Sequence, residues 1–280
     1  MAKLTVFTLT SGRSGTQFLC GLLRKTLPDA TVFHEPYLRR GNPNMFGLPI
    51  YDHWAGNRDA VRQLVAYKRD TIRRYGSDIY IETSHALLKS WWEFAPGYFP
   101  DLKLLHLIRH PLEVARSEAN RHAYLDRWHF PFRNYTGRDG QRYFRWALTG
   151  HEAIYNGFDL AQLTLFQRYL LQWIEIENRA MTFLQRFNLQ TRCLTLHTPN
   201  DLTDPDAIQR LFEFIGRVSM QPDLRTPLST NQTPGQITTI GAEEISQCRE
   251  IIERLPTHYL EIFHHPPYAE CTWHELLQKR

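Results

Sequence analysis

A short loop near the N-terminus combines the residue types that hold an anion. Glycine lets the backbone approach a ligand closely, arginine adds a fixed positive charge, and hydroxyl groups donate hydrogen bonds. A helical pattern follows directly, so a helix N-terminus would present further N–H groups to the anion. A plain turn with a serine cap would not require two glycines and an arginine. The loop residues that carry this prediction are Gly12, Arg13, Ser14, Gly15 and Thr16.

The loop lacks the lysine that a nucleotide kinase or NTPase would carry. Such proteins have the pattern G-x-x-x-x-G-K-[ST], in which the lysine contacts the β- and γ-phosphates of ATP. The nearest lysine here, Lys25, falls well inside the following helical pattern. Its position counts against chemistry at the γ-phosphate of ATP.

A second basic segment places Arg109 at the end of an apolar run, directly before a predicted helix. A guanidinium in that position is well placed to fork onto a phosphate. Ser117 lies two turns along the helix and would face the same ligand only if the ligand lies across the helix. A surface salt bridge is the alternative role for Arg109. We favour the ligand role because the loop and Ser117 accompany it.

The elements that would position these residues alternate between strands and helices. Apolar or β-branched runs predict strands, and amphipathic periodicity predicts helices. This order favours an α/β fold with a mainly parallel central sheet flanked by helices on both faces, formed by a single domain. Ligands of such sheets bind beyond the carboxyl ends of the strands, where the loop lies. Strands are expected at 4–10, 31–33, 78–82, 102–108 and 191–196, and helices at 58–75, 111–120, 159–187 and 205–215.

Residues 121–150 are rich in arginine, histidine and aromatic residues and show no clean periodicity. We expect an irregular insertion here, either a lid or acceptor-binding region or a surface subdomain that packs its own aromatic side chains.

The composition is that of a globular protein of 280 residues, 42% hydrophobic, with a net charge of +4. This charge fits an anionic ligand but is too weak to indicate a nucleic-acid-binding protein. The four cysteines lack the spacing of a zinc site or a disulfide framework. Neither a signal-peptide pattern nor a membrane-spanning apolar stretch is found, so a cytoplasmic location is expected.

Three segments together resemble the sulfotransferase superfamily. Residues 11–19 look like the 5′-phosphosulfate loop, in the arginine-bearing form of tyrosylprotein and some bacterial sulfotransferases. Residues 107–117 are similar to the 3′-phosphate segment, in which an arginine precedes a serine by eight positions. Residues 194–205, continuing into 211–216, resemble the stretch that closes the family's core. The matches occur in family order over about residues 4–216, and they imply a P-loop-like three-layer fold.

The resemblance implies that the chain binds 3′-phosphoadenosine 5′-phosphosulfate (PAPS). Arg13 would stabilise the leaving group and Arg109 and Ser117 would bind the 3′-phosphate. No metal is expected, because arginine and the helix N-terminus supply positive charge. The 5′-phosphosulfate would be held by Gly12, Arg13, Ser14, Gly15, Thr16 and Gln17.

Sulfuryl transfer also needs a base that removes a proton from the acceptor. Glu35 follows the second predicted strand and lies 22 residues after Arg13. A glutamate at about this distance serves as base in the arginine-type enzymes, so Glu35 is the leading candidate. His85 follows the third predicted strand and resembles the catalytic histidine of cytosolic sulfotransferases. It is the second candidate.

One family feature is missing, and two other functions stay open. Cytosolic sulfotransferases carry an Arg-Lys-Gly segment near the carboxyl end, whereas residues 233–237 lack those charges. The alternatives are a P-loop-type kinase of a small molecule or nucleotide, and a non-catalytic nucleotide- or RNA-binding protein that uses residues 121–150. For the sulfotransferase, the acceptor could be a carbohydrate, a lipid, a peptide or a small molecule, while nucleic acid is not expected.

Overall fold

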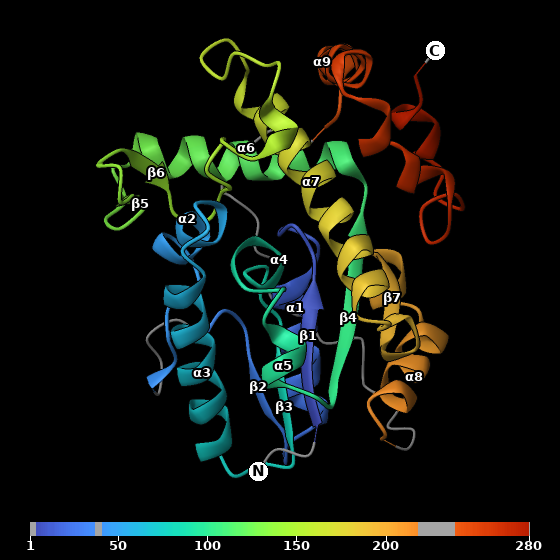
Figure 1. Ribbon diagram of the computed structural model, residues 1–280. Helices are drawn as coiled ribbons and strands as arrows, with labels where there is room; N and C mark the ends of the chain where they lie inside the picture. Colours follow the sequence, from blue (N-terminus) through green and yellow to red (C-terminus); the bar gives the residue numbers. More distant parts are fainter. Residues whose placement is uncertain (1–3, 37–40, 218–238, 280) are drawn as a thin grey trace.

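A five-stranded sheet, parallel throughout, forms the centre of the molecule in the order β2-β3-β1-β4-β7 (Figure 1). The computed structural model describes residues 4–36, 41–217 and 239–279. The parallel sheet, with helices between its strands, confirms the predicted α/β class. The strands are β1 (Leu4–Leu9), β2 (Thr31–Phe33), β3 (Ile79–Glu82), β4 (Leu102–Arg109) and β7 (Cys193–Thr198).

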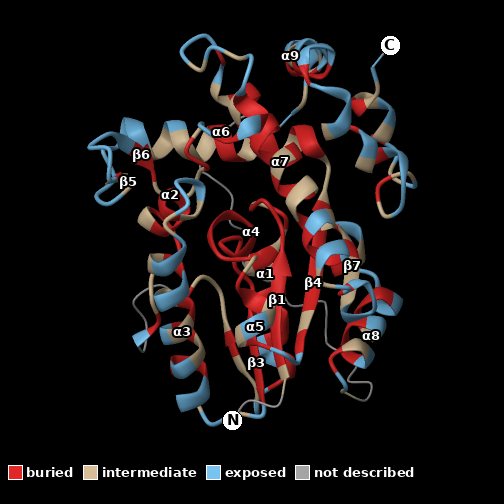
Figure 2. Cartoon of the chain, viewed as in Figure 1, coloured by how far each residue is buried: buried red, intermediate tan, exposed pale blue. Residues whose placement is uncertain are grey.

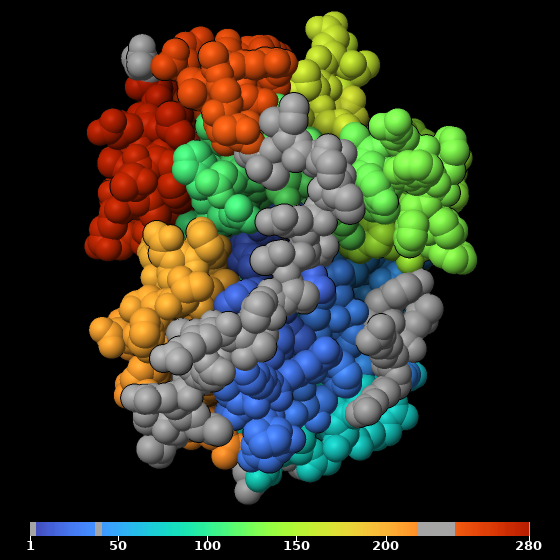
Figure 3. All heavy atoms as spheres, turned by 180° about the vertical axis from the view of Figure 1, so that it is seen from behind, coloured from blue at the N-terminus to red at the C-terminus, as the bar shows by residue number. Residues whose placement is uncertain are grey.

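Helices cover both faces of the sheet, because successive side chains of a buried strand point to opposite sides. Val6 of β1 belongs to one apolar cluster and its neighbour Phe7 to the other. The Val6 side is covered by α1 (Thr16–Thr26) and α8 (Pro205–Phe214), the blue and orange segments at the centre and left of Figure 3. The Phe7 side packs against α3 (Arg58–Arg74), α4 (Leu87–Ser90), α5 (Ala95–Tyr98) and α7 (Leu165–Arg186). In Figure 2 the central strands and α4 are largely red, that is, buried, whereas the outer helices alternate between buried and exposed residues.

Helix α6 (Pro111–Arg127) corrects one prediction. It continues seven residues beyond the expected end at 120, so residues 121–127 are helical and not part of an irregular insertion. Arginine, histidine and aromatic residues are compatible with a helix, and the next residue that cannot continue one is Pro131. Beyond the helix, β5 (Asn134–Thr136) and β6 (Arg142–Phe144) form an antiparallel pair.

Helix α7 also corrects a boundary, because it begins at Leu165 and not near 159. The backbone N–H of Gln167 donates to the Thr164 hydroxyl at 3.2 Å, and the backbone N–H of Thr164 donates to the Gln167 side chain at 3.0 Å. These two bonds form a capping box, which fixes where the helix starts. The short helix α2 (Leu48–Trp54) was not expected.

The carboxyl-terminal part contains α9 (Ala242–Arg254) and three single 3₁₀ turns. It lies beside α6 and α7, beyond the carboxyl edge of the sheet (Figure 1). Across the ranges that the structure describes, no helix is both long and apolar enough to cross a membrane.

Candidate active site

The loop between β1 and α1 depends on glycine at two positions. Gly12 and Gly15 have φ angles of 115° and 85°, which side-chain-bearing residues rarely adopt. A Cβ on residue 12 would also lie 2.6 Å from Oε1 of Glu118, and one on residue 15 would lie 2.6 Å from Leu202. Arg13 itself has a φ of 54°. The loop is therefore a tight left-handed turn packed directly against its neighbours.

This turn leads into α1 without a side-chain cap from any described residue. The first-turn N–H groups of a helix have no intrahelical acceptor and favour an anion. The Ser14 hydroxyl donates to the Gly12 carbonyl at 3.0 Å, so it fixes the shape of the loop. Thr16 is buried at the start of the helix and Gln17 is half-buried.

Arg109 and Ser117, both distant in sequence, contact this loop. Nε of Arg13 donates to the Ser117 hydroxyl at 2.9 Å, and Nη1 of Arg109 donates to the Arg13 carbonyl at 3.0 Å. Arg109 also pairs with Glu113 at 2.8 Å, so the salt bridge considered from the sequence is present alongside the loop contact. The fold thus joins the two predicted phosphate segments into one basic site. Burial, together with the charges of Arg121 and Arg109, lowers the pKa of Arg13.

Glu35 and His85 form a pair at the ends of two adjacent strands, β2 and β3. Oε1 of Glu35 lies 3.2 Å from Nε2 of His85, and the His85 ring is 3.4 Å from the Cβ position of Gly12. Parallel strands end at the same edge of a sheet, which explains how residues so far apart in sequence meet beside the loop. The structure therefore places both predicted bases in one unit.

The surroundings fix the charges of this pair. Burial raises the pKa of Glu35, but the adjacent His85, with smaller contributions from His34 and Arg121, outweighs it and lowers the pKa to about 2. Burial and nearby Lys89 lower the pKa of His85 to about 4, although Glu35 opposes the shift. At neutral pH the pair is therefore a carboxylate that accepts a hydrogen bond from a neutral imidazole.

Three charged residues beside the loop were not predicted from the sequence. Lys89 is fully buried and its ammonium donates to the carbonyl of Trp146 at 2.7 Å. Glu118 is 2% exposed, and its Oε1, the atom that faces Gly12, has no hydrogen-bond partner among the described residues. Arg121 lies 3.8 Å from Glu118 and over the ring of Trp146. Burial lowers the pKa of Lys89 to about 8, although Glu118 opposes the shift.

Taken together, the side chains around the loop carry more positive than negative charge. The cations of Arg13, Lys89 and Arg121 stand against the carboxylates of Glu35 and Glu118. A buried site with this balance suits an anionic ligand, because a low dielectric strengthens each interaction. Only the i, i+3 spacing of Glu118 and Arg121 was visible in the sequence, and it required the longer α6 to be recognised.

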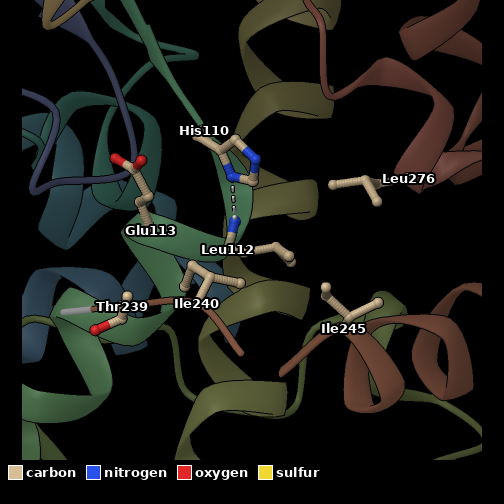
Figure 4. A pocket seen from close by; sticks show the side chains of 7 residues that line it. All are labelled: His110, Leu112, Glu113, Thr239, Ile240, Ile245 and Leu276. Atoms are coloured by element: carbon tan, nitrogen blue, oxygen red, sulfur yellow. Dashed lines mark hydrogen bonds between the residues drawn. The ribbon is translucent and has the colours of Figure 1, made fainter. Parts of the chain in front are cut away.

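A cavity of about 440 Å³ is lined by Glu113 together with residues of the carboxyl-terminal part (Figure 4). His110, directly before α6, and Leu112 of α6 line it on one side, with Ile245 of α9 and Leu276 of the last 3₁₀ turn. None of the predicted site residues lines it. Glu113, the partner of Arg109, is the residue that connects the cavity with the basic site.

No protein-family model and no curated protein matches this chain. Among solved structures it is similar to a sulfotransferase from Alicyclobacillus acidocaldarius, with 16% identity, a TM-score of 0.49, and 96% of this chain and 99% of that chain covered. It is also similar to the sulfotransferase domain from the curacin biosynthetic pathway, with 15% identity, a TM-score of 0.46, and 83% and 80% covered. A third similar structure is the sulfotransferase domain of the Synechococcus PCC 7002 olefin synthase. It has 16% identity and a TM-score of 0.45, with 78% of this chain and 74% of that chain covered. All three are described as sulfotransferases or sulfotransferase domains.

Proposed function

We propose that this chain is a sulfotransferase that moves a sulfuryl group from PAPS to a hydroxyl or amine of an acceptor. One observation carries the proposal. The fold joins the two segments that resemble phosphate-binding elements, through the contacts of Arg13 with Ser117 and of Arg109 with the Arg13 carbonyl. A carboxylate–histidine pair lies directly against the same loop.

The residues present suit an elongated, doubly phosphorylated anion. The uncapped N-terminus of α1 and Arg13 would hold the 5′ end, with Ser14, Gly15, Thr16 and Gln17 around it. Arg109 and Ser117, which meet Arg13 from the neighbouring strand and helix, would hold the 3′-phosphate. PAPS supplies the sulfuryl group and takes away the leaving phosphate. The segment at 233–237, where the family's Arg-Lys-Gly would lie, is outside the described residues.

The pair of Glu35 and His85 would remove the acceptor's proton as its oxygen or nitrogen bonds to sulfur. The Glu35 side chain is 22% exposed and that of His85 only 3%, so Glu35 offers the face that an acceptor can reach. His85 then acts as a positioning residue that holds the carboxylate in place. A pKa of about 2 makes Glu35 fully ionised but a weak base, so proton removal would accompany bond formation.

Arg13 would stabilise the charge that develops on the leaving phosphate. It lies just before the N-terminus of α1, where the positive end of the helix dipole would stabilise the same negative charge. The sulfur–oxygen bond to the phosphate breaks as the bond to the acceptor forms. The acceptor's proton goes to Glu35, and the electron pair leaves with the phosphate.

Calorimetry with 3′,5′-ADP tests the cosubstrate. We expect binding without magnesium, and we expect Arg109→Gln to weaken it by about 1.5–3 kcal/mol, the range for a charged hydrogen bond. Glu93→Gln, in a surface ion pair with Arg58 and Arg186, is the matched control and should leave binding unchanged. Binding of Mg-ATP but not of 3′,5′-ADP would indicate the kinase instead.

Transfer from radiolabelled PAPS to a panel of phenols, amines and sugars tests the reaction. Glu35→Gln should reduce turnover by about 10²–10⁴-fold, the usual contribution of a general base, while 3′,5′-ADP still binds. If the chain were a non-catalytic nucleotide-binding protein, the wild type and Glu35→Gln would both bind 3′,5′-ADP and neither would transfer the sulfuryl group.

A further inference from the structure

Three large hydrophobic side chains are exposed within five consecutive residues. Trp128, Phe130 and Phe132 are 65%, 47% and 74% exposed, and they follow directly on the end of α6. The other large exposed hydrophobic side chains among the described residues, Trp54 and Tyr67, lie elsewhere. We call residues 127–133 the aromatic tip. It lies at the outer end of α6 beside β5 and β6, at the side of the molecule (Figures 1 and 3).

The backbone of the aromatic tip is strained. His129 and Phe132 have φ angles of 46° and 65°, which are strained for residues with large side chains. The turn is pinned by backbone bonds from His129 to Asp126 and from Phe130 to Leu125, at 3.0 and 2.9 Å. A strained turn that exposes its aromatic side chains is not what folding alone would favour, because burial of those rings would stabilise the chain.

Side chains fix the same turn. Nε of Arg133 donates to Asp126 at 2.8 Å, and its Nη1 donates to the Phe130 carbonyl at 3.2 Å. The tip is therefore preorganised, so little conformational entropy would be lost when it meets a partner.

The segment that carries the tip is rich in arginine. Residues 121–145 contain six arginines, two aspartates, and no lysine or glutamate, so this segment has a net charge of +4. The whole chain also has a net charge of +4, so the residues outside this segment carry equal numbers of positive and negative charges. Arg127, within the tip, and Arg142, on β6, are both exposed. The partner of this surface is therefore expected to be negatively charged as well as apolar.

We propose that the aromatic tip docks this protein on the surface of an anionic lipid bilayer. Tryptophan and phenylalanine side chains insert among lipid headgroups and upper acyl chains, while arginines remain at headgroup level. Each basic residue near an anionic membrane adds about 1 kcal/mol. The chain would thus bind the membrane peripherally.

Two other occupants fit the surface less well. A stable dimer buries about 800 Å² on each partner, and three aromatic side chains of about 150–250 Å² each, already partly covered, fall short of that area. Single-stranded nucleic acid follows a basic groove lined by stacking rings. The three rings here stand within five consecutive residues at the free end of a helix.

Flotation of the full chain with vesicles tests the proposal. The chain should bind vesicles of phosphatidylcholine and phosphatidylglycerol in equal parts, and bind more weakly to phosphatidylcholine alone. Added salt should weaken the binding, because it screens the arginines. Trp128→Ser/Phe130→Ser/Phe132→Ser should reduce binding to the mixed vesicles at least about tenfold, and Arg127→Gln should reduce it less.

Trp54→Ser/Tyr67→Ser is the control, since it removes the other large exposed rings of the described residues, and it should bind like the wild type. The Phe132→Ser single variant, at the most exposed ring, guards against loss of folding in the triple variant. Equal vesicle binding by the triple variant would overturn the proposal. So would a tip-dependent affinity for a single-stranded oligonucleotide without vesicle binding. Both results measure binding and not sulfuryl transfer, so this test is independent of the test of the proposed reaction.

Discussion

Glu35 and His85 appear in the sequence as rival bases, yet their 3.2 Å contact makes them one unit. The reason is chemical as well as geometric. Burial makes His85 more stable when neutral, although the charge of Glu35 opposes this, and the contact with His85 keeps Glu35 ionised despite its burial. Lys89, Glu118 and Arg121 then set the charge around the pair, although none of them follows a predicted strand.

The dependence of turnover on pH follows from these charges. Glu35 and His85 have pKa values of about 2 and 4, so neither changes charge between about pH 5 and 7, and the rate should be flat there. Lys89 loses its proton as the pH rises through about 8, which removes a cation from the site, so the rate should fall above that pH. A pH–rate profile measured with saturating PAPS checks both statements.

Lys89→Arg separates this explanation from a general alkaline loss. Arginine stays charged over the whole range, so the fall near pH 8 should disappear even if turnover is lower. An unchanged fall in this variant would show that another group is responsible.

Arg13 is the residue on which charge stabilisation depends most directly. Arg13→Ala should lower turnover by about 10²–10³-fold, as for the loss of one donor to a developing charge. It also removes the bond to Ser117, so the affinity for 3′,5′-ADP should fall as well. Steady-state kinetics and calorimetry measure the two effects, with the solvent-facing Arg210→Ala as a control that should change neither.

At the scale of elements, the site depends on how tightly β1 turns into α1. The turn uses φ angles that glycine accepts at Gly12 and Gly15, and it leaves no space at either for a side chain. The adjoining strand end at Arg109 and the second turn of α6 close on the loop from the other side. An anion site built this way is rigid before its ligand arrives, which reduces the entropic cost of binding.

Gly12→Ala tests this rigidity. The new Cβ would meet Glu118 at 2.6 Å and force alanine to a φ of 115°, so we expect a loss of about 1–3 kcal/mol in the free energy of unfolding and a loss of 3′,5′-ADP binding. Gly97→Ala in α5 is the matched control. A Cβ there meets nothing within 4 Å, and alanine favours a helix, so stability should be equal or slightly higher. Equal midpoints of urea unfolding for the two variants would contradict the steric explanation.

At the scale of the whole molecule, one buried network ties the carboxyl-terminal part to the α/β core. Glu177 of α7 lies 2.8 Å from Nε2 of His106 on β4 and accepts a bond from the Tyr268 hydroxyl, also at 2.8 Å. All three side chains are buried. Since a buried polar group without a hydrogen-bond partner is costly, this network favours the docking of the carboxyl-terminal part in one arrangement.

Tyr268→Phe should lower the free energy of unfolding by about 1–3 kcal/mol, the cost of leaving a buried acceptor without this hydrogen-bond partner. Tyr67→Phe, at a half-exposed ring, should change it by less than about 0.5 kcal/mol. Urea unfolding followed by tryptophan fluorescence measures both. A loss below that of the control would show that water replaces the missing hydroxyl.

The sequence by itself determined the features that are local in the chain. The order of strands and helices, the loop at residues 11–15 and the eight-residue step from Arg109 to Ser117 are all patterns of neighbouring residues, and periodicity and residue type reveal them. Thr164 and Gln167 carried a local signal too, because a T-x-x-Q pattern marks a helix start, and it gives the true beginning of α7.

Only the tertiary structure decided which distant residues meet. Glu35 reaches His85 because β2 and β3 are neighbours in the sheet, a fact of strand order that no local pattern contains. Glu118 and Arg121 join the site because α6 continues past residue 120, and Lys89 because α4 packs against β1. The anion-binding loop could be predicted since its chemistry lies in consecutive residues. The cluster that sets its charges could not, since burial and proximity between separate elements create it.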